Sequence, residues 1–285
     1  MEAYINVPGG KIWYKVVGQK KKIPLVVLHG GPGFPHDYLE VLENLGDERE
    51  IIFYDQLGCG KSDRPDDPHL WTVERFVEEL EEIVRFLGFS EYHVLGQSWG
   101  AALAVSFALK QPAGLKSIIL ADPYLSSPLW MKDAERLKTL LPKDTQEIMA
   151  RHEREGTVES VEYGEAIKKY NDAFVLRLAS VPEAIQRSED GMSKIIYRTM
   201  WGFKEPLLTG TLKEFDLADR LHEVLLPVLL LCGRYDEATP ESTRYFQTLF
   251  PNARMEIFEK SAHLPFLSET REFLGVVRKF FQEID

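Results

Sequence analysis

The chain has 285 residues, of which 44% are hydrophobic and 28% charged, and its formal net charge is −11. This size and composition fit one large globular domain, or one domain carrying an insertion, and exclude a disordered or fibrous protein. The acidic excess argues against nucleic acid and anionic membranes as partners, because both are polyanionic and would repel the chain.

The first residues and the cysteines indicate a compartment. Residues 1–18 are polar and lack a continuous apolar run, and no later stretch is apolar over the length that a bilayer requires. The two cysteines, Cys59 and Cys232, lie far apart in the sequence, and free thiols are typical of a reducing environment. We therefore expect a cytoplasmic protein with no membrane partner.

The predicted elements begin with strands. Alternating apolar and polar residues on either side of Pro8-Gly9-Gly10 predict a hairpin of Ala3–Val7 and Lys11–Val17. Six later runs are largely apolar, as in strands that are buried on both faces of a sheet. These runs are Pro24–His29, Glu50–Tyr54, Tyr92–Gly96, Lys116–Ala121, Leu226–Cys232 and, less purely, Arg254–Phe258.

Helices are predicted between these strands. In Thr72–Leu87 apolar residues recur at steps of three and four, with Thr72 as N-cap and Gly88 as the stop. Three further segments have helical patterns, namely Ala101–Leu109, Pro240–Phe250 and Pro265–Phe281. This alternation of strand and helix predicts an α/β fold with a mostly parallel central sheet flanked by helices.

One segment interrupts the alternation. From 124 to 210 the sequence is charged and helical in character and contains no convincing strand. We predict a helical cap inserted into a catalytic domain that is formed by residues 1–123 and 211–285. Because the insertion follows a strand of the sheet, it would lie over the carboxyl edge, where open α/β folds bind ligands.

The stretch LGQSWG, residues 95–100, places Ser98 between Gly96 and Gly100 directly after a predicted strand. A serine in a glycine-rich turn needs no function, because glycine and serine both favour tight turns. The alternative is a nucleophile elbow, in which a strand turns sharply into a helix and presents the serine at the edge of the sheet. That interpretation requires a base, an acid and oxyanion donors elsewhere in the chain.

The chain supplies these groups in the expected order of serine, acid and histidine. Asp236 follows the Leu226–Cys232 strand, and His263 lies between the last predicted strand and the last helix. Asp122 also follows a strand after the serine but ranks below Asp236, because it lies nearer the insertion, while Asp55 precedes the serine. We predict that Ser98, Asp236 and His263 form a catalytic triad.

The chain also contains candidate oxyanion donors, whereas it lacks the common metal-binding motifs. The backbone N–H groups of Trp99, directly after the serine, and of Gly31, in the HGGPG loop, are the predicted donors. The GCGKSD stretch lacks the first glycine of a phosphate-binding loop, because that position is Asp55. No H-E-x-x-H or paired C-x-x-C motif is present, so we expect neither a metal nor a cofactor.

These motifs make the chain resemble the proline iminopeptidase branch of the α/β-hydrolases. The resemblance rests on HGGPG at 29–33, YDQLGCGKSD at 54–63, GQSWGA at 96–101, GRYDE at 233–237 and SAH at 261–263. It implies an α/β-hydrolase fold with a helical cap. It also implies that two glutamates capture the free amino group of the substrate, at positions that match Glu237 and Glu205 here.

The resemblance implies a serine exopeptidase that releases proline or another hydrophobic N-terminal residue from short peptides or amino-acid amides. A general amidase or esterase without a free-amine requirement is one alternative, and a non-catalytic binder of a small ligand is another. Four aromatic residues are equally consistent with an apolar substrate pocket and with the core of the cap. They are Trp99, Tyr170, Phe174 and Trp201.

Overall fold

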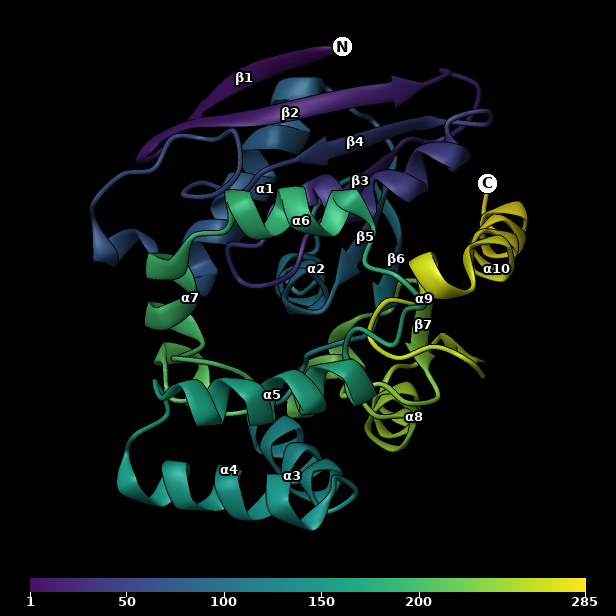
Figure 1. Cartoon of the computed structure of the whole chain (residues 1–285). Helices are drawn as coiled ribbons and strands as arrows, with labels where there is room; N and C mark the ends of the chain where they lie inside the picture. Colours follow the sequence, from purple (N-terminus) through teal and green to yellow (C-terminus); the bar gives the residue numbers. More distant parts are fainter.

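A computed structural model describes all residues from Met1 to Asp285, and its centre is one eight-stranded sheet (Figure 1). The strand order is β1-β2-β4-β3-β5-β6-β7-β8. β1 and β2 form an antiparallel hairpin, β2 is antiparallel to β4, and the remaining neighbours are parallel. The strands are β1 Glu2–Val7, β2 Gly10–Gly18, β3 Leu25–Leu28, β4 Glu50–Tyr54, β5 Tyr92–Gln97, β6 Leu115–Ala121, β7 Val228–Gly233 and β8 Ala253–Phe258.

The predicted fold class is confirmed, since every predicted strand overlaps one strand of the sheet. The prediction that all six apolar runs are buried on both faces is wrong for β8. This strand pairs only with β7 and lies at the edge of the sheet, so Arg254 and Glu256 remain exposed. An edge strand with one solvated side alternates in burial, whereas a central parallel strand does not.

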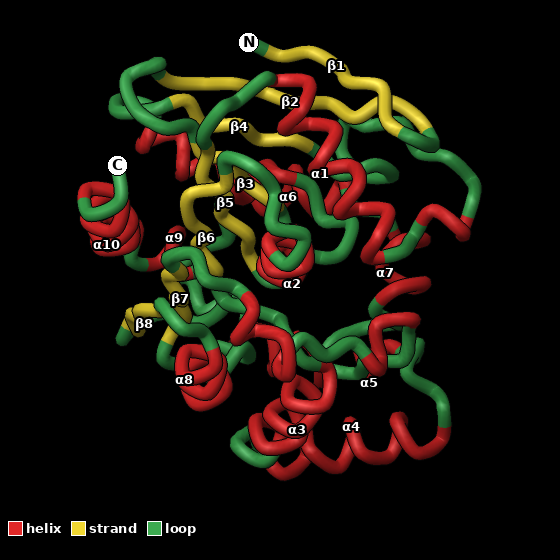
Figure 2. The backbone as a smooth tube through the Cα atoms, turned by 180° about the vertical axis from the view of Figure 1, so that it is seen from behind, coloured by secondary structure: helices red, strands yellow, loops and turns green.

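Helices cover both faces of the sheet because successive strand residues point to opposite sides. In β3, Val26 and Leu28 join the apolar core under α1 and α2, while Leu25 and Val27 join the core under η1 and α10. Figure 2 shows the same arrangement from behind. The covering helices are η1 His36–Leu45, α1 Val73–Leu87, α2 Trp99–Ala108, α8 Pro240–Leu249, α9 Pro265–Ser268 and α10 Thr270–Gln282.

The predicted helix ends agree with the structure at α1 and differ near the C-terminus. Thr72 caps α1 by accepting a hydrogen bond from Arg75 N, and Gly88 ends it with φ 66°. The prediction of one helix over Pro265–Phe281 is wrong, because α9 and α10 are separate helices that meet at Glu269. The Glu269 carboxylate there accepts hydrogen bonds from Lys260 N and Ser261 Oγ.

Five helices lie between β6 and β7 in the sequence; in Figure 1, α3, α4 and α5 lie at the bottom, α7 lies at the left, and α6 crosses in front of the sheet. Three of them share a small apolar core that includes Leu137, Met149 and Tyr170. α6 instead packs against η1, where Ser188 Oγ accepts a hydrogen bond from Tyr38 N. The five are α3 Ser127–Lys138, α4 Lys143–Glu155, α5 Val161–Phe174, α6 Glu183–Gly191 and α7 Lys194–Met200. Short 3-10 turns complete the chain, namely η2 Pro68–Leu70, η3 Thr211–Glu214 and η4 Ala218–Glu223.

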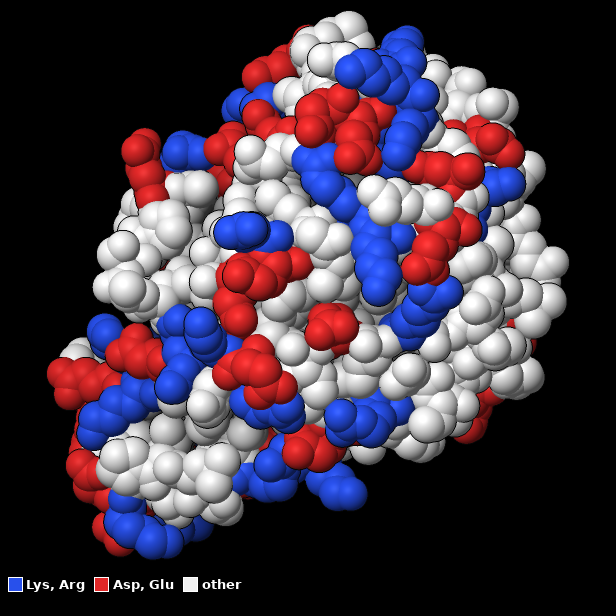
Figure 3. Space-filling view, turned by 90° about the vertical axis from the view of Figure 1, so that its right-hand side faces the viewer, with Lys and Arg blue, Asp and Glu red and all other residues white.

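The charged side chains are spread over the surface, and the two cysteines are not bonded to each other. Figure 3 shows acidic and basic side chains interspersed over one face, without a large patch of a single sign. None of the helices has both the length and the apolar character needed to cross a bilayer. Cys59 and Cys232 are both buried and free.

Candidate active site

The LGQSWG stretch forms a sharp turn from strand to helix. β5 ends at Gln97, α2 begins at Trp99, and Ser98 between them has φ 55° and ψ −116°. A Cβ on Gly96 would lie 2.1 Å from Gly100 O, and a Cβ on Gly100 would lie 2.3 Å from Leu28 O. Only glycine fits at these two positions, because backbone atoms occupy the space that a side chain would need. The turn therefore has the geometry of a nucleophile elbow.

Backbone hydrogen bonds to the next strand fix the position of Ser98. Its N–H donates to Ala121 O at 2.9 Å, at the end of β6. Its side chain lines a cavity of about 260 Å³ at the carboxyl edge of the sheet. Gly31, Glu205 and His263 line the same cavity, so four of the predicted site residues meet there.

Asp236 and His263 form a buried hydrogen-bonded pair. Asp236 lies in the loop after β7 and His263 in the loop after β8, and His263 Nδ1 is 2.7 Å from Asp236 Oδ1. The same carboxylate oxygen accepts a hydrogen bond from Ala238 N at 2.8 Å. With the ring proton on Nδ1, the Nε2 atom of His263 is free to accept a proton.

The surroundings of His263 change its basicity. Burial by itself would lower the pKa of His263, but the negative charges of Asp236 and, to a smaller extent, Glu205 raise it above the ordinary value. Ser98 and His263 line one cavity without a hydrogen bond between their side chains. Nucleophile and base are often this loosely arranged in a free enzyme and come together when substrate binds.

The two predicted oxyanion donors flank the elbow. Trp99 is the first residue of α2, so its N–H has no partner within the helix and lies at the positive end of the helix dipole. Gly31 lines the cavity with φ 113°, and its N–H donates to no other group of the protein. A Cβ on Gly31 would lie 2.7 Å from Phe34 N, so a residue with a side chain would not fit at this position.

The two predicted amine-binding glutamates lie together beside the triad. Glu205 follows α7 and lines the main cavity, whereas Glu237 is 2% exposed and borders a separate small space. Neither carboxylate oxygen of Glu237 has a hydrogen-bond partner. The hydroxyl groups of Tyr170 and Tyr197 lie beside Glu237 and Glu205, although the Tyr170 hydroxyl also lacks a full hydrogen bond.

Burial and mutual repulsion shape the charges of this pair. Burial raises the pKa of Glu237 well above its ordinary range, and the neighbouring Glu205 raises it further. Burial likewise raises the pKa of Glu205, which His263 partly offsets. Two carboxyl groups that are buried beside each other need a cation or a shared proton to offset their mutual repulsion. The pair is therefore suited to an ammonium group.

The four aromatic residues belong to the interior and not to the wall of the main cavity. Trp99 Nε1 donates to Gln56 Oε1 at 3.0 Å, which ties the elbow to the loop after β4. Trp201 packs edge-on against Tyr124 and Trp130. Tyr170 and Phe174 lie in the small core of α3, α4 and α5. The wall of the cavity is instead formed by other apolar residues, namely Phe34, Val175, Leu176, Ile185, Met192 and Leu264.

One set of site residues was missed from the sequence. Tyr38 Oη accepts a hydrogen bond from Gly30 N at 2.8 Å and donates to Gln97 Oε1 at 2.6 Å. Gln97 Nε2 in turn donates to His263 O at 3.2 Å. The three bonds connect the loop after β3, the elbow and the histidine loop. No local signal identifies them, because the partners are 59 and 166 residues apart.

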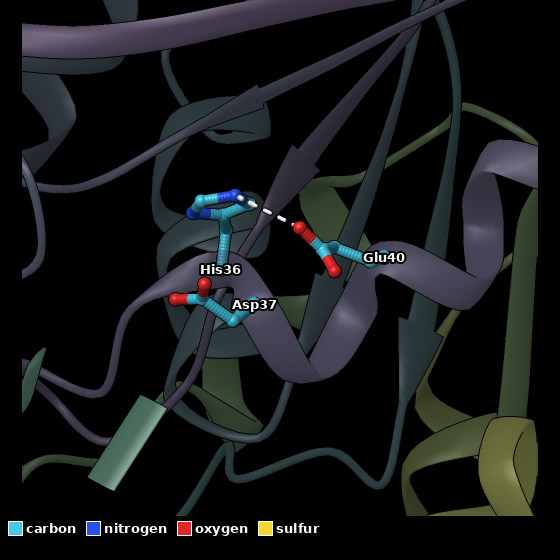
Figure 4. A group of neighbouring side chains, drawn as sticks. All are labelled: His36, Asp37 and Glu40. Carbon is cyan, nitrogen blue, oxygen red and sulfur yellow. Dashed lines mark ion pairs between the residues drawn. The ribbon is translucent and has the colours of Figure 1, made fainter. Parts of the chain in front are cut away.

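A second group of titratable side chains lies on η1, and each of its members is paired within the protein. Figure 4 shows His36, Asp37 and Glu40, with 4.0 Å between His36 Nε2 and Glu40 Oε1. His36 Nδ1 is bound to Asp55 at 2.7 Å. Arg187 of α6 pairs with Asp37 at 3.2 Å and also with Glu40. These contacts are those of an ion-pair network that holds α6 against η1.

The fold and the elbow define a hydrolase of the α/β class, and the comparisons agree. The family model of the alpha/beta hydrolase fold matches residues 23–270. The chain is 44% identical to a proline iminopeptidase of Heyndrickxia coagulans over 99% of both chains. It is 36% identical to one of Clostridium botulinum, over 100% of this chain and 99% of the relative.

Two solved structures extend the similarity. The crystal structure of VinJ superposes with a TM-score of 0.96 at 33% identity, over 100% of this chain and 99% of that one. A proline iminopeptidase of Mycobacterium smegmatis superposes with a TM-score of 0.93 at 34% identity, over 99% and 98% of the two chains. The chain belongs to the proline iminopeptidase family of α/β hydrolases, and the predicted resemblance is confirmed.

Proposed function

We propose that the protein is a serine exopeptidase that releases an N-terminal residue, proline or another hydrophobic amino acid, from short peptides and amino-acid amides. The observation that carries this proposal is the cavity shared by Ser98, His263 and Glu205. It combines a nucleophile and its base with a buried negative charge that recognises a free amine. Full-length relatives that are named proline iminopeptidases support the same activity.

In this mechanism Ser98 Oγ attacks the carbonyl carbon of the first residue while His263 Nε2 takes its proton. Asp236 keeps the imidazole oriented through the 2.7 Å bond to Nδ1. The N–H groups of Gly31 and Trp99 stabilise the oxyanion. His263 then protonates the leaving amine, and a water molecule, activated by the same imidazole, releases the amino acid from the acyl-enzyme. Side chains, backbone amides and water suffice for each step, so no cofactor is invoked.

The two glutamates, Glu205 and Glu237, determine which peptide bond of the substrate is cleaved. An ammonium group that leaves water needs compensating negative charge, which Glu205 and Glu237 provide beside the triad. Fixing the ammonium places only the first carbonyl of a peptide against Ser98. We further propose that residues 124–210 act as the cap of a catalytic domain formed by 1–123 and 211–285. Glu205 and α5 then close the cavity from the cap side.

The decisive experiment compares a prolyl anilide that has a free amine with its N-acetylated counterpart, and repeats the pair with leucyl and alanyl groups. Turnover restricted to the free amines supports the exopeptidase. Equal turnover of the acetylated compounds would leave the triad in place but make the protein a general amidase or esterase. A binder without catalytic activity would react with none of them and would resist labelling by a serine-directed organophosphonate. Short cytoplasmic peptides as the natural substrates stay a prediction.

A further inference from the structure

Asp122 lies at the same edge of the sheet as the triad, and it has no role in the proposed mechanism. It directly follows β6 and is completely buried. Its backbone has φ 51°, which is uncommon for a residue other than glycine. Its N–H donates to Leu231 O of β7 at 2.7 Å. This bond holds the start of the β6 loop against the strand that leads to Asp236.

Three of the four carboxyl oxygens of Asp122 and Asp236 have no hydrogen-bond partner unless a proton lies between the two groups. Neither oxygen of Asp122 has a protein partner, and Asp236 Oδ2 also has none. The Gln97 amide and the Gly233 N–H approach Asp122, but neither reaches hydrogen-bond geometry with its oxygens. A carboxylate oxygen of Asp122, a carboxylate oxygen of Asp236 and a ring nitrogen of His263 lie within 4.8 Å of one another. Two adjacent buried carboxylates, one of which has no donor at all, would be strongly destabilising if both were charged.

The contacts of the two carboxyl groups decide which of them holds the proton. Asp236 Oδ1 accepts two hydrogen bonds, from His263 Nδ1 and from Ala238 N, and both favour its charged form. Asp122 accepts none. Burial and the nearby charge of Asp236 raise the pKa of Asp122 well above its ordinary range. The neutral group of the pair is therefore Asp122.

We propose that Asp122 is a neutral carboxylic acid that donates a hydrogen bond to Oδ2 of Asp236 and thereby acts as a positioning residue for the triad. The proposal rests on the role of Asp236 in the proposed function. The bond gives Asp236 Oδ2 the donor that it otherwise lacks and holds the carboxylate in the plane that His263 Nδ1 requires. It also withdraws negative charge from Asp236, and so moderates the basicity of His263.

Other groups around the pair do not offer this donor. Gln97 uses its amide on His263 O, and the Tyr38 hydroxyl donates to Gln97. The Cys232 thiol is buried and free, and it forms no hydrogen bond with Asp122 or with Asp236 Oδ2. The remaining titratable side chains near Asp122, Asp236 or His263 are Tyr170, whose hydroxyl lies beside Glu237, and the two glutamates Glu205 and Glu237. Both are acceptors when ionised, so they add to the need for a proton on Asp122.

Two substitutions at this position separate hydrogen bonding from packing. Asp122→Asn keeps the shape and supplies an N–H donor in place of the O–H, and asparagine tolerates the left-handed backbone. Asp122→Gly removes the donor and also tolerates φ 51°. We expect kcat of Asp122→Asn to stay within about threefold of the unmodified protein, and kcat of Asp122→Gly to fall roughly tenfold or more. Equal losses in the two variants, or no loss in either, would overturn the proposal.

The pH profile provides a readout that a purely structural role would not change. Without the donor, Asp236 presents its full negative charge to His263 and raises the pKa of the imidazole further. The acidic limb of kcat/KM, which reports the protonated and inactive base, therefore moves to higher pH in Asp122→Gly. It stays in place in Asp122→Asn. A limb that is unchanged in the glycine variant contradicts the proposed bond.

Infrared spectroscopy tests the proton itself, independently of activity. In protein labelled with ¹³C at the aspartate carboxyl carbon, the difference spectrum between the unmodified protein and Asp122→Asn at neutral pH should contain the carbonyl band of a protonated acid. A spectrum with carboxylate bands alone overturns the proposal. If the proposed function fails but the protonated-acid band is present, the buried acid pair is real and only its role in peptide cleavage is wrong.

Discussion

The carboxyl edge of the sheet and the helical segment between β6 and β7 contribute to the site in different ways. Ser98, Asp236 and His263 come from the edge, where each follows a strand that is held in register by its neighbours. Glu205 comes from the loop after α7, in a segment without strands. In the proposed mechanism, bond cleavage thus depends on residues that follow paired strands, and substrate choice depends on a residue from the helical segment. Variants at the edge should change kcat, and variants of the amine site should change selectivity.

The largest expected effect is at the edge. Ser98→Ala removes the nucleophile, and we expect kcat to fall roughly 10⁴-fold or more while the fold is kept. The amine site should remain intact, so binding of proline, followed by thermal shift, should be similar to that of the unmodified protein. Activity that survives in Ser98→Ala would remove Ser98 from the mechanism. Loss of proline binding would show that the two regions are not separable.

The two regions should also differ in pH dependence, because each contains its own titrating groups. The pKa of His263 is raised, so protonation removes the free base and kcat falls as pH decreases through that raised value. The pKa values of Glu205 and Glu237 are also raised, so protonation removes the charge that binds the amine and KM increases as pH decreases. Below both values kcat/KM should therefore fall by up to about a hundredfold per pH unit.

Steady-state kinetics between neutral and mildly acidic pH check this expectation. An acylating ester substrate without an amine serves as the control, because it should show only the His263 limb. A free-amine substrate whose KM is independent of pH would contradict the assignment of the two glutamates.

Removing charge beneath the helical segment should give the next largest effect. In Glu237→Gln or Glu205→Gln an ammonium would lose one charged hydrogen bond, which corresponds to about tenfold to a hundredfold in kcat/KM for free-amine substrates. Turnover of an N-acetylated ester should hardly change. Glu189→Gln is the matched control, because Glu189 of α6 also lines the cavity but lies outside the acidic pair. If all three variants lose activity equally, only the general negative potential of the cavity matters.

The sequence predicts the edge better than the segment above it, for a physical reason. The elbow depends on Gly96 and Gly100, which stand within two residues of Ser98 in the sequence, and the strands are short apolar runs that a pattern can find. Asp236 and His263 follow from their order after such strands. Glu205 was found only through a family resemblance, because nothing in its own surroundings distinguishes it from other charged residues of a helical segment.

Contacts between distant segments account for the residues that the sequence did not identify. Asp122 was ranked as a less favoured acid because it lies nearer the insertion. Its closeness to Asp236 was not predicted, since it depends on the pairing of β6 with β7 across more than a hundred residues of chain. η1 was not predicted at all. Its position beside the site depends on α6, through the hydrogen bond from Tyr38 N to Ser188 Oγ. Such pairings become visible only when the chain is folded.

The smallest effect should come from the hydrogen bonds that tie the loops of the edge together. Tyr38→Phe removes the hydroxyl that accepts from Gly30 N and donates to Gln97 Oε1, while the ring can keep its packing against Phe34 and Phe266. The oxyanion loop and the elbow then lose a direct link, and we expect kcat to fall about threefold to tenfold. The preference for free amines should stay unchanged, because the acidic pair is not touched. Tyr245→Phe, at an exposed position on α8, is the control and should behave as the unmodified protein. A change in amine preference in Tyr38→Phe would show that the edge takes part in substrate choice, and the division between the two regions would no longer hold.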